Sequence, residues 1–397
     1  MLRNGHEQLK MEVNTADIPL SRYPRPGLKR DSFLCLNGKW ETGQNVPFPM
    51  GSCLSGVTGH APKEAVYERK FTLPQGFVKD RVLLNFGAVD QCADVFVNSE
   101  HVGSHEGGYI PFSLDITDAV NDEGIENTLI VKVTDKLSKV YGYGKQRKKR
   151  GGMWYTPVSG IWQSVWLESV SNDCIKAIEI VPSLTGIDLN IDSEANDYTI
   201  SIYFDGKEIY SEHTCYDLCH IDIEDPKLWT PDEPNLYTIK IKTPHDAVSS
   251  YFGLRTVEIG EVKGIKRILL NGKPFFFHGV LDQGYFPEGI YTPNDESVYE
   301  DDIKRLKALG INMIRKHIKV EPESFYEACD RLGMIVFQDM VNNGTYKYVR
   351  HTVLPTLGYQ KLDDTKVKVP FEAKNEYALE MEDTLVTLFN HPSLNIV

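Results

Sequence analysis

The first 172 residues carry short apolar runs separated by turn residues. In the run from residue 93 to 97, Ala93, Val95 and Val97 share one face, which is the period of a strand with one buried side. Asn98-Ser99-Glu100 follows as a hairpin turn. This pattern predicts a jelly-roll β-sandwich over residues 1–172. The runs that support it are 66–71, 81–86, 93–97, 127–133 and 162–167.

Residues 173–257 repeat the strand pattern on a smaller scale. Tyr198–Phe204 alternates between apolar and polar positions, Asp205-Gly206 is a hairpin turn, and Lys207–Tyr210 returns. A later strand is expected at Leu236–Ile241. Short strands over this length favour an immunoglobulin-like β-sandwich.

From residue 258 the pattern changes to alternating strands and helices. A continuous apolar strand is expected at 275–280, as where both faces of a sheet are covered. Thr292-Pro293 is expected to open a helix, with a capping oxygen before a proline at the first helical position. Further strands are predicted at 311–318, 334–337 and 394–397, and further helices at 323–332 and 371–390.

This repeat predicts the first half of a (β/α)8 TIM barrel over residues 258–397, because a full barrel needs roughly 250 residues. An open sheet of four parallel strands is the alternative. It would leave the outer strand edges and much apolar helix surface bare.

The bulk composition is that of an ordinary globular protein, with 41% apolar and 25% charged residues. The net charge of −13 disfavours a nucleic-acid partner, whose phosphates need a basic face. The one basic run, Lys145–Arg150, is interpreted as a solvated loop in preference to a phosphate site.

Seven cysteines with no Cys-x-x-Cys pair suit a reduced compartment. The first ten residues lack the apolar core of a secretory signal, and no run of 18 apolar residues exists. A cytoplasmic protein without a membrane span is therefore expected, although a removed signal peptide would leave no trace. No metal site and no cofactor are expected, since the spacing of His213, Cys215, Cys219 and His220 matches no usual zinc pattern.

Polar residues follow the predicted parallel strands, at the end of a barrel where function is found. Together they predict a pocket that could hydrogen-bond a polyhydroxylated ligand. The alternative is structural, with Arg315 and Asp339 as a buried ion pair that fixes adjacent strands. The residues are Asp282, Gln283, Arg315, Lys316, His317, Gln338 and Asp339.

In order along the chain, several motifs resemble those of glycoside hydrolase family 2, which includes β-galactosidases, β-glucuronidases and β-mannosidases. Each is weak alone, and their order over nearly the whole chain is the signal. They are Tyr-Pro-Arg-Pro at 23–26, Leu-Asn-Gly-Lys-Trp at 36–40, and the segments 86–90, 107–112, 115–117, 159–168, 228–231, 235–237, 253–255, 270–274, 309–315 and 390–393.

The resemblance implies a hydrolase of terminal β-glycosidic bonds, β-galactosidase-like, that retains configuration through two Glu residues roughly 5 Å apart. In the family one Glu is the acid/base at the end of barrel strand four and the other is the nucleophile at the end of strand seven. Both positions are expected after Val397, so no catalytic residue is assigned within the chain, and the chain by itself is expected to be inactive.

The resemblance carries over to this chain only in part. Arg315 matches an Arg near the family nucleophile, His317 lies near a sugar-binding His, and Asp339 matches an acidic strand end. Leu281-Asp282-Gln283 stands where the family often has Asn-Arg-His, and the loop Trp154–Pro157 replaces one with an Asp.

Trp154 could stack on a sugar face or pack within the jelly roll. The candidate substrate-binding residues are Asp282, Gln283, Arg315, His317, Asp339 and Trp154.

A carbohydrate is the expected partner, and homo-oligomerisation stays open. Two other hypotheses remain. The chain could be a non-catalytic carbohydrate-binding fragment, or two sandwiches followed by an unrelated open α/β domain.

Overall fold

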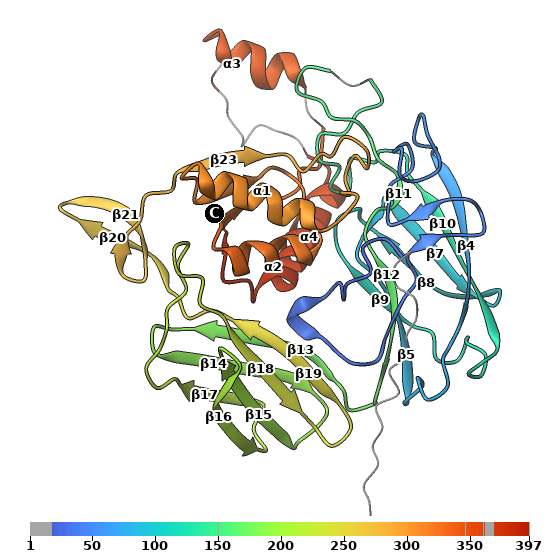
Figure 1. The fold of residues 1–397 in the computed structure, drawn as a ribbon. Helices are drawn as coiled ribbons and strands as arrows, with labels where there is room; N and C mark the ends of the chain where they lie inside the picture. The colour runs from blue at the N-terminus through green and yellow to red at the C-terminus, as the bar shows by residue number, and fades with distance from the viewer. Residues whose placement is uncertain (1–17, 150, 346, 360, 362–368, 397) are drawn as a thin grey trace, which may run out of the picture.

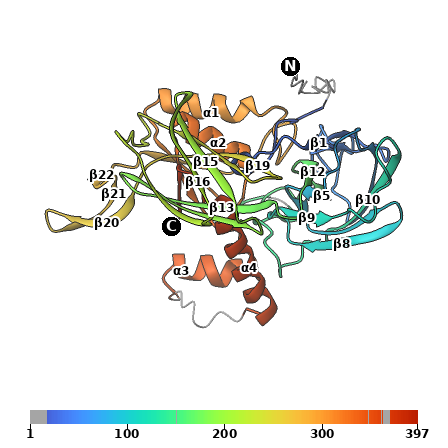
Figure 2. The same ribbon diagram turned by 90° about the horizontal axis from the view of Figure 1, so that it is seen from below.

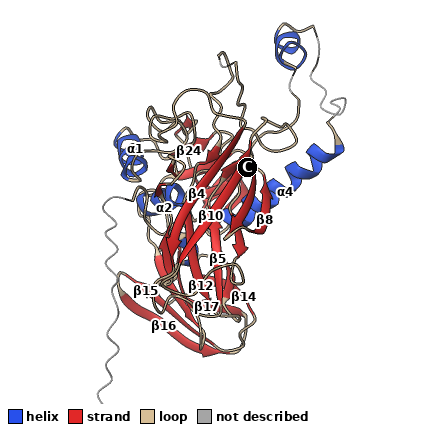
Figure 3. Cartoon of the chain, turned by 90° about the vertical axis from the view of Figure 1, so that its right-hand side faces the viewer, coloured by secondary structure: helices blue, strands red, loops and turns tan. Residues whose placement is uncertain are grey.

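The computed structural model describes residues 18–149, 151–345, 347–359, 361 and 369–396. Two β-sandwiches and an α/β unit follow one another along the chain, and the second sandwich lies against both other parts (Figures 1 and 2). Helices flank the strands on two opposite sides in the upper part of the molecule (Figure 3). Within the described ranges, no helix combines the length and the apolar character that a membrane crossing requires.

The first sandwich consists of two four-stranded antiparallel sheets. One sheet has the order β1 (Phe33–Cys35), β12 (Val165–Val170), β5 (Arg81–Phe86) and β9 (Phe112–Asp115). The other has the order β4 (Glu64–Thr72), β10 (Glu126–Thr134), β7 (Cys92–Val97) and β8 (Glu100–Glu106).

The alternation of buried and exposed side chains along the strands defines the core of this sandwich. Val131 lies opposite Tyr67 on one side and Val95 on the other, and all three are fully buried between the sheets. The expected hairpin turn is confirmed. Asn98 and Ser99 adopt positive φ, and the Asn98 side chain holds the turn by donating to the carbonyl of Ala119 at 2.8 Å.

The second sandwich packs sheet β13-β14-β17 on sheet β16-β15-β18-β19, the seven-strand arrangement expected of an immunoglobulin-like unit. Its core is rich in isoleucine, and the Asp205-Gly206 turn joins β15 to β16 as predicted. The strands are β13 (Ile175–Pro182), β14 (Gly186–Ser193), β15 (Tyr198–Phe204), β16 (Lys207–Thr214), β17 (Leu218–Asp222), β18 (Tyr237–Lys242) and β19 (Ala247–Phe252).

The α/β unit contains four parallel strands in the order β23-β24-β25-β26, after a small antiparallel sheet β20-β21-β22. The parallel strands are β23 (Gly279–Asp282), β24 (Met313–Lys316), β25 (Ile335–Gln338) and β26 (Leu394–Ile396). Its main helices are α1 (Ser297–Ala308), α2 (Glu323–Leu332) and α4 (Phe371–Leu388). The sheet of described strands is open, with β23 and β26 at its edges.

Short elements complete the chain. They are η2 (Pro26–Leu28), β2 (Gly38–Lys39), β3 (Asn45–Val46), β6 (Val89–Asp90), β11 (Gly160–Ile161), β20 (Val257–Val262), β21 (Ile265–Leu270), β22 (Lys273–Pro274), η3 (Val349–Val353) and α3 (Leu354–Thr356).

Two predictions at the start of the α/β unit are wrong. The first parallel strand begins at Gly279 and not at Phe275, and Phe276 is 81% exposed. Asn312 causes this, because its side chain bonds the backbone of Phe276 and His278 and holds the preceding chain outside the sheet. Helix α1 begins at Ser297, because the Thr292 hydroxyl donates to the carbonyl of Trp162 at 2.6 Å and so does not cap a helix.

The turn between α4 and β26 fastens the second sandwich to the α/β unit. Asn390 bonds the backbone of β13 through both amide atoms, at 2.8 Å to Ile178 and 2.9 Å from Ile180. Next to it, His391 lies 2.6 Å from the buried Asp330 carboxylate, which also accepts a hydrogen bond from the hydroxyl of Tyr251 at 2.7 Å.

These bonds predict a pH-dependent contribution to stability. Burial alone would lower the pKa of His391, but the charge of Asp330 and its hydrogen bond outweigh burial and raise it. A raised pKa in the folded state stabilises the protein fully below the ordinary histidine value, and this stability is lost as pH rises through the folded value.

We expect Asp330→Asn to lower the free energy of unfolding by about 3 kcal/mol in mildly acidic solution, because it leaves the His391 charge uncompensated. Urea titrations from mildly acidic to mildly alkaline pH would measure this loss and its decrease as pH rises. The control is Asp188→Asn, which removes the exposed partner of His220 and should leave stability unchanged. An equal loss at every pH would contradict the role of the His391 charge.

The outer edge of β23 predicts self-association. Leu281 is 51% exposed on this strand, and an uncovered apolar strand edge is a template for pairing. We expect the chain to associate in sedimentation velocity experiments and Leu281→Lys to shift it toward the monomer. Leu309→Lys, at an exposed leucine just after α1, should not do so. A monomeric wild-type chain at all concentrations would contradict this prediction.

Candidate active site

The C-terminal ends of β23, β24 and β25 bring polar residues into one row. In the parallel register, Asp282 lies opposite Lys316, and Lys316 lies opposite Gln338. The row continues into His317 and Asp339, the residues that follow two of these strands. Polar side chains therefore meet at one edge of the sheet, as the sequence predicted.

An ionic cluster around two buried lysines forms the inner part of this row. The Lys316 ammonium donates to Asp282 and, at 2.9 Å, to Glu321. The other oxygen of Glu321 lies 2.8 Å from the ammonium of Lys319. Lys319 also donates to the carbonyls of Gly284 and Tyr291, at 2.7 Å each. Both lysines are 1% exposed, and each buried charge has an opposite charge beside it, as burial requires.

The cluster shifts the pKa of its members in different directions. Burial alone would lower the pKa of Lys316, but the charges of Glu321 and Asp282 raise it. Burial lowers the pKa of Lys319 to about 8, against the opposing effect of Glu321. Burial would raise the pKa of Asp282, and the Lys316 charge lowers it instead.

The outer layer of the row is held by Asp339. One of its oxygens lies 2.9 Å from Nε of Arg315, and the other lies 2.9 Å from Nδ1 of His317. On the far side of the ring, the Lys145 ammonium lies 3.4 Å from Nε2 of His317. An ammonium can only donate, so this contact places the lone pair on Nε2 and the hydrogen on Nδ1, toward Asp339.

The structural alternative, in which Arg315 and Asp339 form a buried pair, holds only in part. They are paired, but the Arg315 side chain is 54% exposed. Its guanidinium therefore keeps donors that face solvent at the strand ends.

A loop of the first sandwich reaches these strand ends. The backbone of Tyr155 pairs with Lys145 and Arg147 at 3.1 Å, so residues 145–147 and 155 form one stiff unit. The Tyr155 ring meets His317 edge-on, with ring centroids 6.2 Å apart. Burial raises the pKa of the Tyr155 hydroxyl, and the side chain of Gln283 opposes this rise. The basic run is thus a solvated loop only in part, because Lys145 contacts His317 while Lys148 and Lys149 are exposed.

Trp154 lies beside this unit and is covered by the guanidinium of Arg147, 3.6 Å from the ring centroid. The aromatic residue of the loop that reaches the strand ends is therefore Tyr155. Among the candidate residues, the structure brings Gln283, Arg315, His317 and Asp339 together with this loop, above the half-buried Asp282 and its buried partner Lys316.

A buried network anchors the loop to both units. Gln146 donates to Asp90 at 3.1 Å and to the hydroxyl of Tyr109 at 3.2 Å, and Tyr109 shares a 2.9 Å bond with Tyr291. Burial raises the pKa of Asp90 well above its ordinary value, and the nearby charge of Asp135 adds to the effect. The loop therefore has a fixed position relative to β24.

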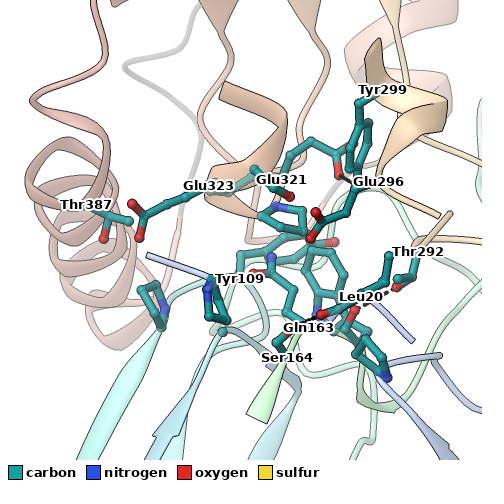
Figure 4. Close-up of a pocket in the computed structure, with 18 of the residues that line it drawn as sticks. Leu20, Tyr109, Gln163, Ser164, Thr292, Glu296, Tyr299, Glu321, Glu323 and Thr387 are labelled. Carbon is teal, nitrogen blue, oxygen red and sulfur yellow. Dashed lines mark hydrogen bonds between the residues drawn. The ribbon is translucent and has the colours of Figure 1, made fainter. Parts of the chain in front are cut away.

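A second hollow lies on the other side of Glu321, between the first sandwich and helices α1 and α2 (Figure 4). Glu296, Glu321 and Glu323 line it, and burial raises the pKa of Glu296 to about 7 although Arg22 lowers it. Its volume of about 40 Å³ holds only a few waters, so a sugar does not fit there.

Sequence reasoning missed Lys319, Glu321 and Tyr155. A signal for the first two was present, because Lys316, Lys319 and Glu321 interrupt an apolar segment that includes Ile314, Ile318 and Val320. Charged residues inside such a segment must pair with one another.

Among the described residues, no group of three or more His, Cys, Asp and Glu side chains is placed to hold a metal ion. His213 faces Asp197 and His220 faces Asp188, all on exposed strands or turns of the second sandwich.

Three family models match the chain in sequence order. They are the family 2 glycosyl hydrolase sugar binding domain over residues 23–170, the family 2 glycosyl hydrolase model over 169–255, and the family 2 TIM barrel domain over 261–396. The matched ranges together span nearly all of the described residues.

Curated relatives are similar at low identity. A β-galactosidase of Thermoanaerobacter pseudethanolicus is 27% identical over 302 residues, which cover 69% of this chain and 39% of the relative. A β-glucuronidase of Paenibacillus borealis is 24% identical over 388 residues, covering 88% of this chain and 61% of the relative. The chain thus spans about two fifths to three fifths of the length of these relatives.

Solved structures share the fold. A β-D-glucuronidase of Dictyoglomus thermophilum superposes with a TM-score of 0.75 at 21% identity, covering 94% of this chain and 67% of the other. A β-glucuronidase of Ruminococcus gnavus gives a TM-score of 0.77 at 18% identity, covering 93% and 67%. With the three family models matched in order, the chain belongs to glycosyl hydrolase family 2.

Proposed function

We propose that this chain is part of a β-glycosidase that hydrolyses terminal β-glycosidic bonds with retention of configuration, through two Glu residues that lie after Val397. The observation that carries the proposal is the row of polar side chains at the ends of β23, β24 and β25, closed on one side by the Tyr155 loop. Both carboxylates of this row, Asp282 and Asp339, are held by cations. They suit binding and positioning better than proton transfer or attack on the sugar.

Each residue of the row has a proposed role that follows from its contacts. Asp339 orients Arg315 and His317, so that the guanidinium presents its remaining donors to sugar oxygens. Gln283 and Tyr155 supply an amide and a hydroxyl at the rim. The buried Lys316 holds Asp282 and stiffens the floor. Trp154 remains a candidate for the outer wall.

Two alternatives are proposed for the sugar of the substrate, a galactose and a glucuronate. The resemblance of the sequence motifs favours a β-galactosidase-like activity, while several relatives are named β-glucuronidase. The exposed donors of Arg315 and the nearby ammonium of Lys145 support a sugar that carries a carboxylate.

The domain boundaries are proposed at 1–172, 173–257 and 258–397, with the third domain as the first half of a TIM barrel. The four parallel strands with helices between them support this proposal. The uncovered edges of the sheet are where further strands of a barrel would pair.

A non-catalytic carbohydrate-binding role is the second candidate. The observation that favours it is a second cleft, between the two sandwiches and the helices.

The proposal predicts binding without turnover for this chain. Methyl β-D-glucuronide or methyl β-D-galactoside should bind, and 4-nitrophenyl β-glycosides should release no nitrophenol. Asp339→Asn should weaken binding about tenfold, because Arg315 and His317 lose the charge that orients them. Calorimetric titration and colorimetry measure the two effects.

The control is Asp302→Asn, which removes an exposed helical ion pair with Arg305 and should leave affinity unchanged. Hydrolysis by the purified chain, abolished by a substitution within it, would contradict the placement of both catalytic Glu residues.

A further inference from the structure

A cleft of about 270 Å³ opens where the two sandwiches meet the helices of the α/β unit. Its walls come from the segment around Arg25, from β5, β9 and β12 of the first sandwich, from β13 and β19 of the second, and from α2 and the end of α4. In Figures 1 and 2 the second sandwich lies beside both the first sandwich and the helices at this junction.

The cleft lies away from the strand-end row. Asn390 and His391, which precede β26, form part of its wall, so it lies near the amino end of that parallel strand. None of Asp282, Gln283, Arg315, His317 and Asp339 lines it. It is thus a separate hollow with its own chemistry.

One carboxylate in the cleft has no hydrogen-bond donor. Glu323 is the first residue of α2, and none of the described residues donates a hydrogen bond to it. The neighbouring cations are committed elsewhere, because Arg25 binds Glu168 at 2.9 Å and His391 binds Asp330 at 2.6 Å. Figure 4 shows the Glu323 carboxylate directed toward Thr387 of α4.

The pKa of Glu323 agrees with this geometry. Burial raises it to about 7, and the charges of His391 and Arg25 only partly oppose the rise. A half-buried acceptor without a donor is unfavourable unless a ligand or water supplies one.

Two further polar groups of the cleft walls have spare capacity. The Arg25 side chain is 29% exposed, and no described residue accepts a hydrogen bond from its Nη1 amino group, since its bonds to Glu168 come from Nη2. The Asn85 amide makes one long bond of 3.3 Å from its nitrogen to Leu83, and no described residue donates to its oxygen. The cleft therefore offers two acceptors and one donor, at positions on three different elements.

The rest of the lining is largely apolar. Leu28, Trp166 and Ile178 are buried beneath the cleft, and Pro111 and Phe112 continue this floor. A purely apolar ligand would leave the Glu323 carboxylate and the Nη1 amino group of Arg25 unpaired, at a penalty. A strongly charged ligand would meet charges of both signs, since Lys176 and Arg25 line the cleft with Glu323.

A neutral pyranose ring satisfies both parts of this lining, because its C–H face packs on apolar carbon while its hydroxyls donate and accept at the rim. The volume lies just below that of ordinary ligand pockets, which hold roughly 300–1,000 Å³, and suits a single sugar ring.

We propose that this cleft is a non-catalytic binding site for a neutral hexose unit of a glycan. The Glu323 carboxylate accepts hydrogen bonds from two neighbouring sugar hydroxyls, Arg25 and Asn85 contact a further hydroxyl, and the ring lies over Trp166 and Ile178. The site does not depend on hydrolysis at the strand ends, so it stands or falls separately from the proposed catalytic function.

Titration of the whole chain with methyl β-D-glucopyranoside, followed by saturation-transfer NMR and calorimetry, tests the site. We expect saturable binding that Glu323→Gln weakens at least tenfold, because an amide replaces a charged acceptor at constant size. The matched control is Glu327→Gln, one turn along α2, where the carboxylate faces Lys29 and not the cleft. Its affinity should stay within twofold of the wild type.

A second pair of variants separates the cleft from the strand ends by filling space in the cleft. Ala177→Tyr on β13 should fill the cleft and abolish binding, while Glu179→Tyr, on the same strand but outside the lining, should not. Thermal unfolding of each variant shows whether it folds. Absence of saturable binding, or binding lost in Asp339→Asn and kept in Ala177→Tyr, would overturn the proposal.

Discussion

The position of one ammonium group, that of Lys316, constrains the whole region of the strand ends. It is buried where a charge is tolerated only between carboxylates, so Asp282 and Glu321 must both come within reach. Asp282 ends β23, while Glu321 belongs to the segment between β24 and α2. Their shared contact sets how the first two parallel strands and the second helix approach one another. Lys319 extends the constraint by holding the carbonyls of Gly284 and Tyr291.

The interfaces between units use the same device on a larger scale. At the interface of the second sandwich with the α/β unit, the Asn390 side chain substitutes for a backbone partner along β13. Within the α/β unit, Asn312 does the same at the entrance to β23. Such bonds are directional, so they fix orientation where an apolar interface alone would allow sliding. The candidate site depends on these bonds, because Tyr155 belongs to the first sandwich and His317 to the α/β unit. In the sequence, the whole second sandwich lies between them. A small rotation between the units would separate their rings.

The sequence predicted what depends on local period and turn chemistry. The alternation that ends at Val97, the turn at Asp205-Gly206 and the end of α2 at Gly333, which adopts the left-handed conformation, were all readable without a fold. Helix α1 was placed too early because Thr292 has a hydroxyl suited to capping, and only the fold shows that Trp162 takes it. The strand predicted at 275–280 failed for the same kind of reason, through the distant Asn312.

Within the candidate site, residues that directly follow strands could be predicted, while those supplied by distant loops could not. His317 and Asp339 are visible from strand position alone. That Tyr155 and not Trp154 meets His317 depends on the pairing of residues 145–147 with 155, which no local pattern indicates.

The loop of the first sandwich has a tightly packed base and an open tip within a few residues of each other. At Gly144, an added Cβ would lie 3.1 Å from the Tyr291 hydroxyl and 3.2 Å from the carbonyl of Ile318, so this base admits no larger residue. At Gly151 and Gly152, an added Cβ would meet nothing within 4 Å. Residues inserted at the tip would therefore extend into solvent, while the base of the loop would keep its contacts. Related proteins could exchange tips of different length and so alter which substrates enter, without rebuilding the scaffold beneath.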